Sequence, residues 1–87
     1  MENKNYEFCV KALYDKYESF FLNKKQAKDV LNLSESTFDK YISLGKAPVS
    51  FQENGKVLYT IFDMAEYITR EKGLSSLEVE DLLSKNP

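Results

Sequence analysis

Apolar residues in the first quarter of the chain recur every three or four positions. Side chains at this spacing fall on one face of a helix, so the pattern predicts an amphipathic helix over residues 5–21. We expect this face to pack on a hydrophobic core; the alternative is that its aromatic excess contacts a partner or stacks on bases. The apolar stripe consists of Tyr6, Val10, Leu13, Tyr17, Phe20 and Phe21, widened by Phe8, Cys9 and Tyr14.

The next apolar pattern predicts a short helix over residues 23–31. Asn23 is a good N-cap because its side chain can accept a hydrogen bond from the first turn, and Gln26 follows three residues later, as in a capping box. Asn32 is expected to end the helix, because asparagine tolerates the left-handed conformation that a tight turn requires. The residues expected to be buried are Ala27, Val30 and Leu31 in the helix and Leu33 in the turn.

A third helix is predicted to begin after Ser34, which is a good N-cap, and to run to about Leu44. Gly45 is a plausible stop signal because glycine adopts the left-handed conformation without strain. The buried face is expected to consist of Phe38, Tyr41 and Ile42, with Leu44 near the end. Two short helices joined by a tight turn form a helix-turn-helix unit.

Residues 47–52 and 56–61 alternate between apolar and polar side chains, which is typical of strands. Asn54-Gly55 between them is a strong signal for a β-hairpin turn, because both residues readily adopt positive φ. Five apolar residues share one parity and are expected to lie on one face of the hairpin: Val49, Phe51, Val57, Tyr59 and Ile61.

The last part of the chain predicts two more helices. The first is expected to start at an Asp63 cap, to end at Gly73 and to turn Met64, Tyr67 and Ile68 inward. The second has Ser75 as its cap and Glu78 three residues later, with Leu77, Leu82 and Leu83 as its packing face. The fold class is therefore mainly α with a small β-hairpin, a winged helix-turn-helix with extra helices at both ends. The single domain 1–87 divides into 1–22, the helix-turn-helix 23–45, the wing 46–62 and the C-terminal helices 63–87.

The composition argues against several classes of function. The chain has no histidine and one cysteine, Cys9, so an internal disulfide is impossible and a zinc site is not expected. No nucleophile–base pair and no phosphate-binding glycine loop is present, so we expect no enzyme and no cofactor. Asp63 and Glu66 are better explained as a cap and a solvated residue than as an acid/base pair. The sequence lacks a signal peptide and any apolar run near ~20 residues, so we expect a cytoplasmic protein with no membrane contact.

The charge is unevenly distributed. The whole chain has a formal net charge of −2, whereas residues 23–46 carry five lysines against three acids, which gives +2. The helix-turn-helix is thus the one positive region of the chain, the polarity that contact with DNA requires, although the excess is small.

The segment from residue 21 to 68 resembles the excisionase and MerR-like winged helix-turn-helix family, and covers a little over half of the chain. The members of that family are mostly DNA-binding proteins, often from mobile genetic elements, that act in excision control and other regulation. The residues that carry the resemblance are Ala27, Val30-Leu31, Asn32, Leu33, Ser34, Ser36-Thr37, Phe38, Gly45-Lys46, Pro48, Asn54-Gly55, Asp63-Met64 and Tyr67-Ile68.

The resemblance implies that the second helix of the motif enters the major groove and that the hairpin lies against the backbone. Ser36, Thr37 and Lys40 would then lie at the groove, whereas the lysines expected to meet phosphates are Lys24, Lys25, Lys46 and Lys56. Ser36 and Thr37 have a structural alternative, the completion of a capped first turn. The chain departs from the family at Glu35, where arginine is frequent, and at Asp39, because acids repel phosphates although they can accept from cytosine.

Two hypotheses remain. The first is a weak duplex binder that acts with a protein partner or by self-association in excision, transcription or replication control. The second is a non-catalytic accessory subunit that docks onto a replication or recombination enzyme, such as a polymerase, primase, helicase or integrase, and aids binding of single-stranded or duplex DNA without reading its sequence. For the second, the partner surface would be formed by Tyr6, Phe8, Tyr14 and Tyr17.

Overall fold

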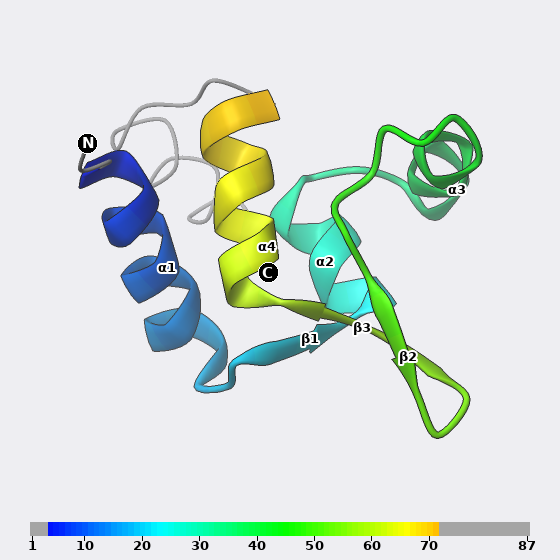
Figure 1. Ribbon diagram of the computed structural model, residues 1–87. Helices are drawn as coiled ribbons and strands as arrows, with labels where there is room; N and C mark the ends of the chain where they lie inside the picture. The colour runs from blue at the N-terminus through cyan, green and yellow to red at the C-terminus, as the bar shows by residue number, and fades with distance from the viewer. Residues whose placement is uncertain (1–3, 72–87) are drawn as a thin grey trace.

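The computed structural model describes residues 4–71 (Figure 1). Helices pack against one face of a small three-stranded antiparallel sheet, which agrees with a mainly α fold with a small hairpin. The predicted helix after Ser75 lies outside the described residues, as does the expected stop at Gly73. The elements in chain order are α1 (Lys4–Tyr17), β1 (Phe21–Asn23), α2 (Lys24–Val30), α3 (Glu35–Ser43), β2 (Phe51–Glu53), β3 (Lys56–Thr60), α4 (Ile61–Glu66) and η1 (Tyr67–Glu71), a π-helical turn that continues α4.

The first helix is shorter than the predicted span 5–21. It ends at Tyr17, because Glu18 adopts a left-handed conformation (φ 53°) and its N–H donates to the Tyr14 carbonyl oxygen at 2.6 Å. The residues that follow form β1, a strand that the sequence did not predict. Phe21 fitted the helical spacing of the predicted stripe, but it is exposed in the strand, and the one buried residue of β1 is Leu22.

The sheet has the strand order β1-β3-β2. The predicted hairpin turn is confirmed, because Asn54 and Gly55 both have positive φ, at 53° and 77°. The predicted common face is wrong for Phe51: the two-residue turn pairs Phe51 with Leu58, which lies on the opposite face of β3 from Val57 and Tyr59. The strand β2 is also shorter than predicted, and Val49 lies before it with 69% of its surface exposed.

The hydrophobic core lies between α1, α2, α4 and one face of the sheet, where α1 and α4 lie side by side (Figure 1). It confirms much of the expected interior, including Ala27, Val30 and Leu31 of α2 and Met64 and Ile68 of the C-terminal helix, while Leu33 and Tyr67 pack against it partly buried. The buried core residues are Cys9, Leu13, Leu22, Ala27, Val30, Leu31, Phe38, Tyr59, Ile61, Met64, Ala65 and Ile68.

The N-cap of α4 is Thr60 and not Asp63. The Thr60 hydroxyl accepts from the Asp63 N–H at 3.0 Å and donates to the Asp63 carboxylate at 3.1 Å. Thr60 thus ends β3 and begins α4, so the helix starts three residues earlier than predicted. The pattern favoured a strand at this residue because threonine is β-branched, although its hydroxyl is also a good cap.

The helix α3 has the predicted bounds and caps but buries less than expected. Phe38 is fully buried, whereas Tyr41 is half-buried and Ile42 and Leu44 are exposed, at 42% and 55% of their surface. The low burial follows from the position of α3, which packs against α2 and projects from the edge of the domain (Figure 1). The contact of α3 with the rest of the domain is therefore small, and Phe38 is the one residue of α3 that it buries fully.

Candidate nucleic-acid interface

Both helices of the predicted motif end in the same hydrogen-bonded cap. After α2, the Asn32 and Leu33 N–H groups donate to the Asp29 and Lys28 carbonyl oxygens. After α3, the corresponding donors are Gly45, to Ile42 at 3.1 Å, and Lys46, to Tyr41 at 2.8 Å. Asn32 and Gly45 have positive φ, at 58° and 71°, which completes a Schellman motif in each case. The turn before α3 and the backbone of Lys46 after it are therefore fixed.

Lys24, at the first turn of α2, forms an ion pair with Asp39 of α3. The hydrogen bond to Asp39, followed by the charges of Asp39 and Glu35, raises the pKa of the Lys24 ammonium. The pair is exposed, so it contributes little to stability. The pair matters more for contact with DNA than for stability. Lys24 is predicted to meet a phosphate, but its positive charge is already balanced by Asp39, an acid on the helix that would enter the groove.

Lys25 is also directed to an acid of its own protein. Its ammonium lies 3.0 Å from the Asp29 carboxylate, and Lys28 approaches the other oxygen of the same group at 2.9 Å. The hydrogen bonds from Lys28 and Lys25 lower the pKa of Asp29. Lys25 is nevertheless well exposed, so a phosphate could replace Asp29 as its partner.

Ser36 and Thr37 belong to the cap of α3. The Ser34 hydroxyl accepts from the Thr37 N–H at 3.2 Å and donates to the Thr37 hydroxyl at 2.9 Å, while the Ser36 hydroxyl lies 3.4 Å away. Thr37 is half-buried and Ser36 is exposed. The structural alternative, the completion of a capped first turn, is thus observed. Of the two hydroxyls, that of Ser36 is the more accessible to a ligand.

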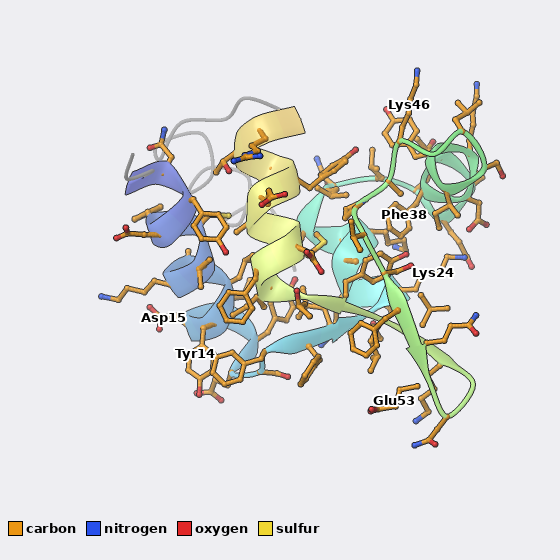
Figure 2. The ribbon with its side chains drawn as sticks, viewed as in Figure 1. Tyr14, Asp15, Lys24, Phe38, Lys46 and Glu53 are labelled. Atoms are coloured by element: carbon orange, nitrogen blue, oxygen red, sulfur yellow. The ribbon has the colours of Figure 1, made fainter. Side chains whose placement is uncertain are left out.

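Three of the predicted lysines are exposed and form no ion pair with another residue of the described range 4–71: Lys40, Lys46 and Lys56. They come from α3, from the turn after it and from the start of β3 in the hairpin. Lys46 and Lys24 lie on the side of the molecule that carries α3 and the hairpin, whereas Tyr14 and Asp15 lie on the opposite side (Figure 2). These three lysines thus come from the elements expected to contact DNA, whereas the exposed cations Lys11 and Lys16 belong to α1.

The predicted partner surface is only partly accessible. Tyr6 and Tyr17 pack against the core, whereas Phe8 and Tyr14 expose 36% and 41% of their surface. Phe20 was predicted to pack on the core and Phe62 was given no role, but both are exposed. They continue from Tyr14 in a row of rings: the Tyr14 and Phe20 centroids lie 5.0 Å apart, and the Phe20 and Phe62 centroids 5.9 Å apart. We call Tyr14, Phe20 and Phe62 the aromatic row.

A second aromatic contact lies on the outer face of the sheet. Phe21 and Phe51 meet edge to face with their centroids 5.8 Å apart, one on each side of β3. The adjacent phenylalanines Phe20 and Phe21 therefore serve two different surfaces, a division that follows from the alternation of side chains in a strand. The sequence could indicate that Phe20 and Phe21 face different surfaces only after the first helix was known to end at Tyr17.

A cleft of about 520 Å³ lies between the turn after α3 and the helix formed by α4 and η1. Lys46 and Arg70 line it together with Asp63 and Glu66, so its walls carry both signs of charge. Asp63 is already bonded to Thr60. Within residues 4–71 no cluster of histidine, cysteine and acidic side chains could hold a metal ion, and no helix is long and apolar enough to cross a membrane.

Cys9 is fully buried in the core of the α1 side. Burial raises the pKa of its thiol to about 12, so the thiol is neutral near pH 7. A buried neutral thiol behaves as a small hydrophobic side chain, which is the role expected for it.

Comparisons of the chain with models of protein families, with curated proteins and with solved structures find no match.

Proposed function

We propose that the chain is a small winged helix-turn-helix protein that binds duplex DNA without catalysis, with α3 in the major groove and the hairpin against the backbone. The resemblance described above adds a role in excision, transcription or replication control of a mobile genetic element. The observation that carries the proposal is the exposure of Lys40, Lys46 and Lys56 on α3, its following turn and the hairpin. These are the elements that a winged helix-turn-helix uses.

The packing of α3 supports its assignment as the recognition helix. Phe38 holds one side of it against the core, where its ring centroid lies 5.7 Å from that of Tyr59. Its exposed residues include Glu35, Ser36 and Lys40 at the N-terminal and middle positions, which reach base edges in helix-turn-helix proteins. A helix with one anchored side and firm caps can enter a groove without refolding.

The small number of cations implies weak binding by a single chain. Three available lysines correspond to a slope of roughly −3 for the logarithm of the binding constant against the logarithm of salt concentration. Such binding is lost easily at physiological salt, so we propose that the protein acts with a partner or by self-association.

The test is a titration of the full chain against random duplex and single-stranded DNA at several salt concentrations. The double variant Lys40→Gln/Lys46→Gln should bind duplex more weakly and with a slope about two smaller. Lys11→Gln/Lys16→Gln on α1 is the matched control, because it removes the same charge from the other side of the molecule. Absence of duplex binding at low salt, or equal losses in both double variants, would show that α3 and its turn are not the interface.

The alternative proposal is a non-catalytic accessory subunit of a replication or recombination enzyme. It is supported by the exposed aromatic row, because large apolar side chains that remain accessible on a small domain are typical of protein interfaces. Retention of such an enzyme in a purification from the native host, combined with no binding of DNA by the chain alone, would favour this proposal over the first.

A further inference from the structure

The aromatic row is held in place by the backbone on both sides of Phe20. The Phe20 carbonyl oxygen accepts from the Ile61 N–H at 2.9 Å, which ties it to the start of α4 beside Phe62. On the other side, the Ser19 hydroxyl accepts from the Phe21 N–H at 3.1 Å and donates to the Phe21 carbonyl oxygen at 2.9 Å. The rings of Phe20 and Phe62 are nearly parallel, at 14°. A preorganised row of rings loses little conformational entropy when it binds a ligand.

The charges around the row are mostly negative. Along α1, Glu7 lies two turns before Tyr14 on the same helical face. Glu18 follows the end of α1, and its N–H donates to the Tyr14 carbonyl oxygen. Asp15 lies beside Tyr14 (Figure 2). Lys11, one turn before Tyr14, supplies a positive charge on the same face.

The α4 side of the row adds more negative charge. Glu66 follows Phe62 by one helical turn and is exposed, and Arg70 follows Glu66 by another turn. The pKa of Tyr6 is raised by burial first and then by the charges of Glu66 and Asp63, so these acids act on the α1 side although they also line the cleft beside Lys46. Together with Glu7, Asp15 and Glu18 of the α1 side, these acids outnumber the bases of the same elements, Lys11, Lys16 and Arg70.

We propose that the aromatic row is a docking surface for a basic amphipathic segment of another protein, in which apolar anchors are flanked by lysine or arginine. The apolar anchors would pack on Phe20 and Phe62, and the basic side chains would meet the acids and the face of the Tyr14 ring. This inference is independent of the DNA-binding proposal, which concerns the opposite side of the molecule.

The charge distinguishes this partner from other occupants. Phosphates of a nucleic acid would be repelled by Asp15, Glu18 and Glu66. Residues 73–87 of the same chain carry three acids and one lysine, so they do not match an acidic surface. A second copy that presented the same row would bring like charges together.

The experiment uses the purified full chain to select peptides from a random displayed library. Enriched peptides should combine apolar residues with lysine or arginine, and a synthetic enriched peptide should bind the double variant Phe20→Ser/Phe62→Ser at least ~10-fold more weakly than the unmodified chain. Phe51→Ser is the matched control, because it removes an exposed ring outside the row, and its binding should stay within about twofold. Circular dichroism checks that each variant remains folded.

A second variant tests the charge without altering the rings. Asp15→Asn/Glu18→Gln should weaken peptide binding by about fivefold at low salt and by less at high salt. The proposal is overturned by no enrichment, by enrichment of acidic peptides, or by binding that survives loss of Phe20 and Phe62. It is equally overturned if the row variant abolishes self-association or the binding of single-stranded DNA instead of peptide binding, because the occupant would then be a second copy or a nucleic acid.

Discussion

The two sides of this molecule differ in how much of their helices is buried. On one side, α1 lies against α4 and η1, and these helices fill the core with Cys9, Leu13, Met64 and Ile68, all fully buried. On the other, α3 buries Phe38 and leaves most of its surface exposed. Stability therefore resides mainly in the α1–α4 side, and α3 is free to present its outward face to a ligand.

The electrostatics of the two sides differ as well. Around the aromatic row the acids exceed the bases, whereas Lys40, Lys46 and Lys56 have no acid partner among residues 4–71. The pairing of Lys24 with Asp39 moderates the positive side. A chain with a net charge of −2 can thus present one basic and one acidic surface, and each is suited to a different class of partner.

The largest expected effect comes from removing the single anchor of α3. Phe38→Ala should lower the free energy of unfolding by about 4 kcal/mol, since a fully buried ring is replaced by a cavity beside Tyr59. Ile42→Ala, on the same helix but exposed, should cost less than about 1 kcal/mol. Urea denaturation of both variants measures the contrast. Equal losses would show that α3 is packed on both residues and that the two sides are not built differently.

The next effect concerns Cys9 on the buried side. Its thiol has a pKa near 9.0 when unfolded and about 12 when folded, so between these values the unfolded state binds fewer protons and stability falls as pH rises. The fall from this group is at most about 1.4 kcal/mol per pH unit, is absent below pH 9 and levels off above the folded pKa.

Thermal denaturation between pH 8 and 10 measures this loss. Burial also raises the pKa values of Tyr17 and Tyr59, which add to the fall at higher pH, so the Cys9→Ala variant is needed to isolate the thiol. That variant should lose less stability over this range than the unmodified chain. An unchanged pH profile would mean that Cys9 is accessible to water and that the α1 side is less closely packed than described.

A smaller effect is expected at the turn that joins α2 to α3. Asn32 has φ of 58°, a conformation that costs other non-glycine residues roughly 1–2 kcal/mol. Asn32→Ala should therefore destabilise the protein by about 1 kcal/mol, while Asn32→Gly should be close to neutral. The comparison is made by chemical denaturation, and a glycine variant as unstable as the alanine one would point to a role for the Asn32 side chain and not its backbone.

The sequence was sufficient for most of the elements whose signals are local, with the exception of the α4 cap, which is Thr60 and not Asp63. The caps at Asn23 and Ser34, the turn at Asn32, the stop at Gly45 and the Asn54-Gly55 hairpin are set by neighbouring residues, and all are present. Three features were missed or wrongly predicted because they depend on tertiary partners. The strand β1 exists only through its pairing with β3, the face of Phe51 depends on the register across the turn, and the exposure of Ile42 depends on where α3 projects.

The candidate site was predictable in its composition but not in its pairing. The lysines were evident from the sequence, whereas the contact of Lys24 with Asp39 joins residues of two different helices and needs the structure. In the same way, Phe20 and Phe62 are more than forty residues apart in sequence, and no periodicity relates them.

The smallest expected effect, and the one most specific to the basic side, follows from that ion pair. Asp39→Asn removes an acid from α3 and releases Lys24, so affinity for random duplex at low salt should rise by about fivefold and the salt slope should steepen by about one. Glu7→Gln on α1 changes the net charge equally without releasing a lysine, and should leave both quantities nearly unchanged. Because asparagine can bond to adenine, Asp39→Ala must show the same gain if charge is the cause. A gain in Asp39→Asn but not in Asp39→Ala would show that residue 39 contacts a base. Equal gains in Asp39→Asn and Glu7→Gln would show that the change in net charge alone causes the effect.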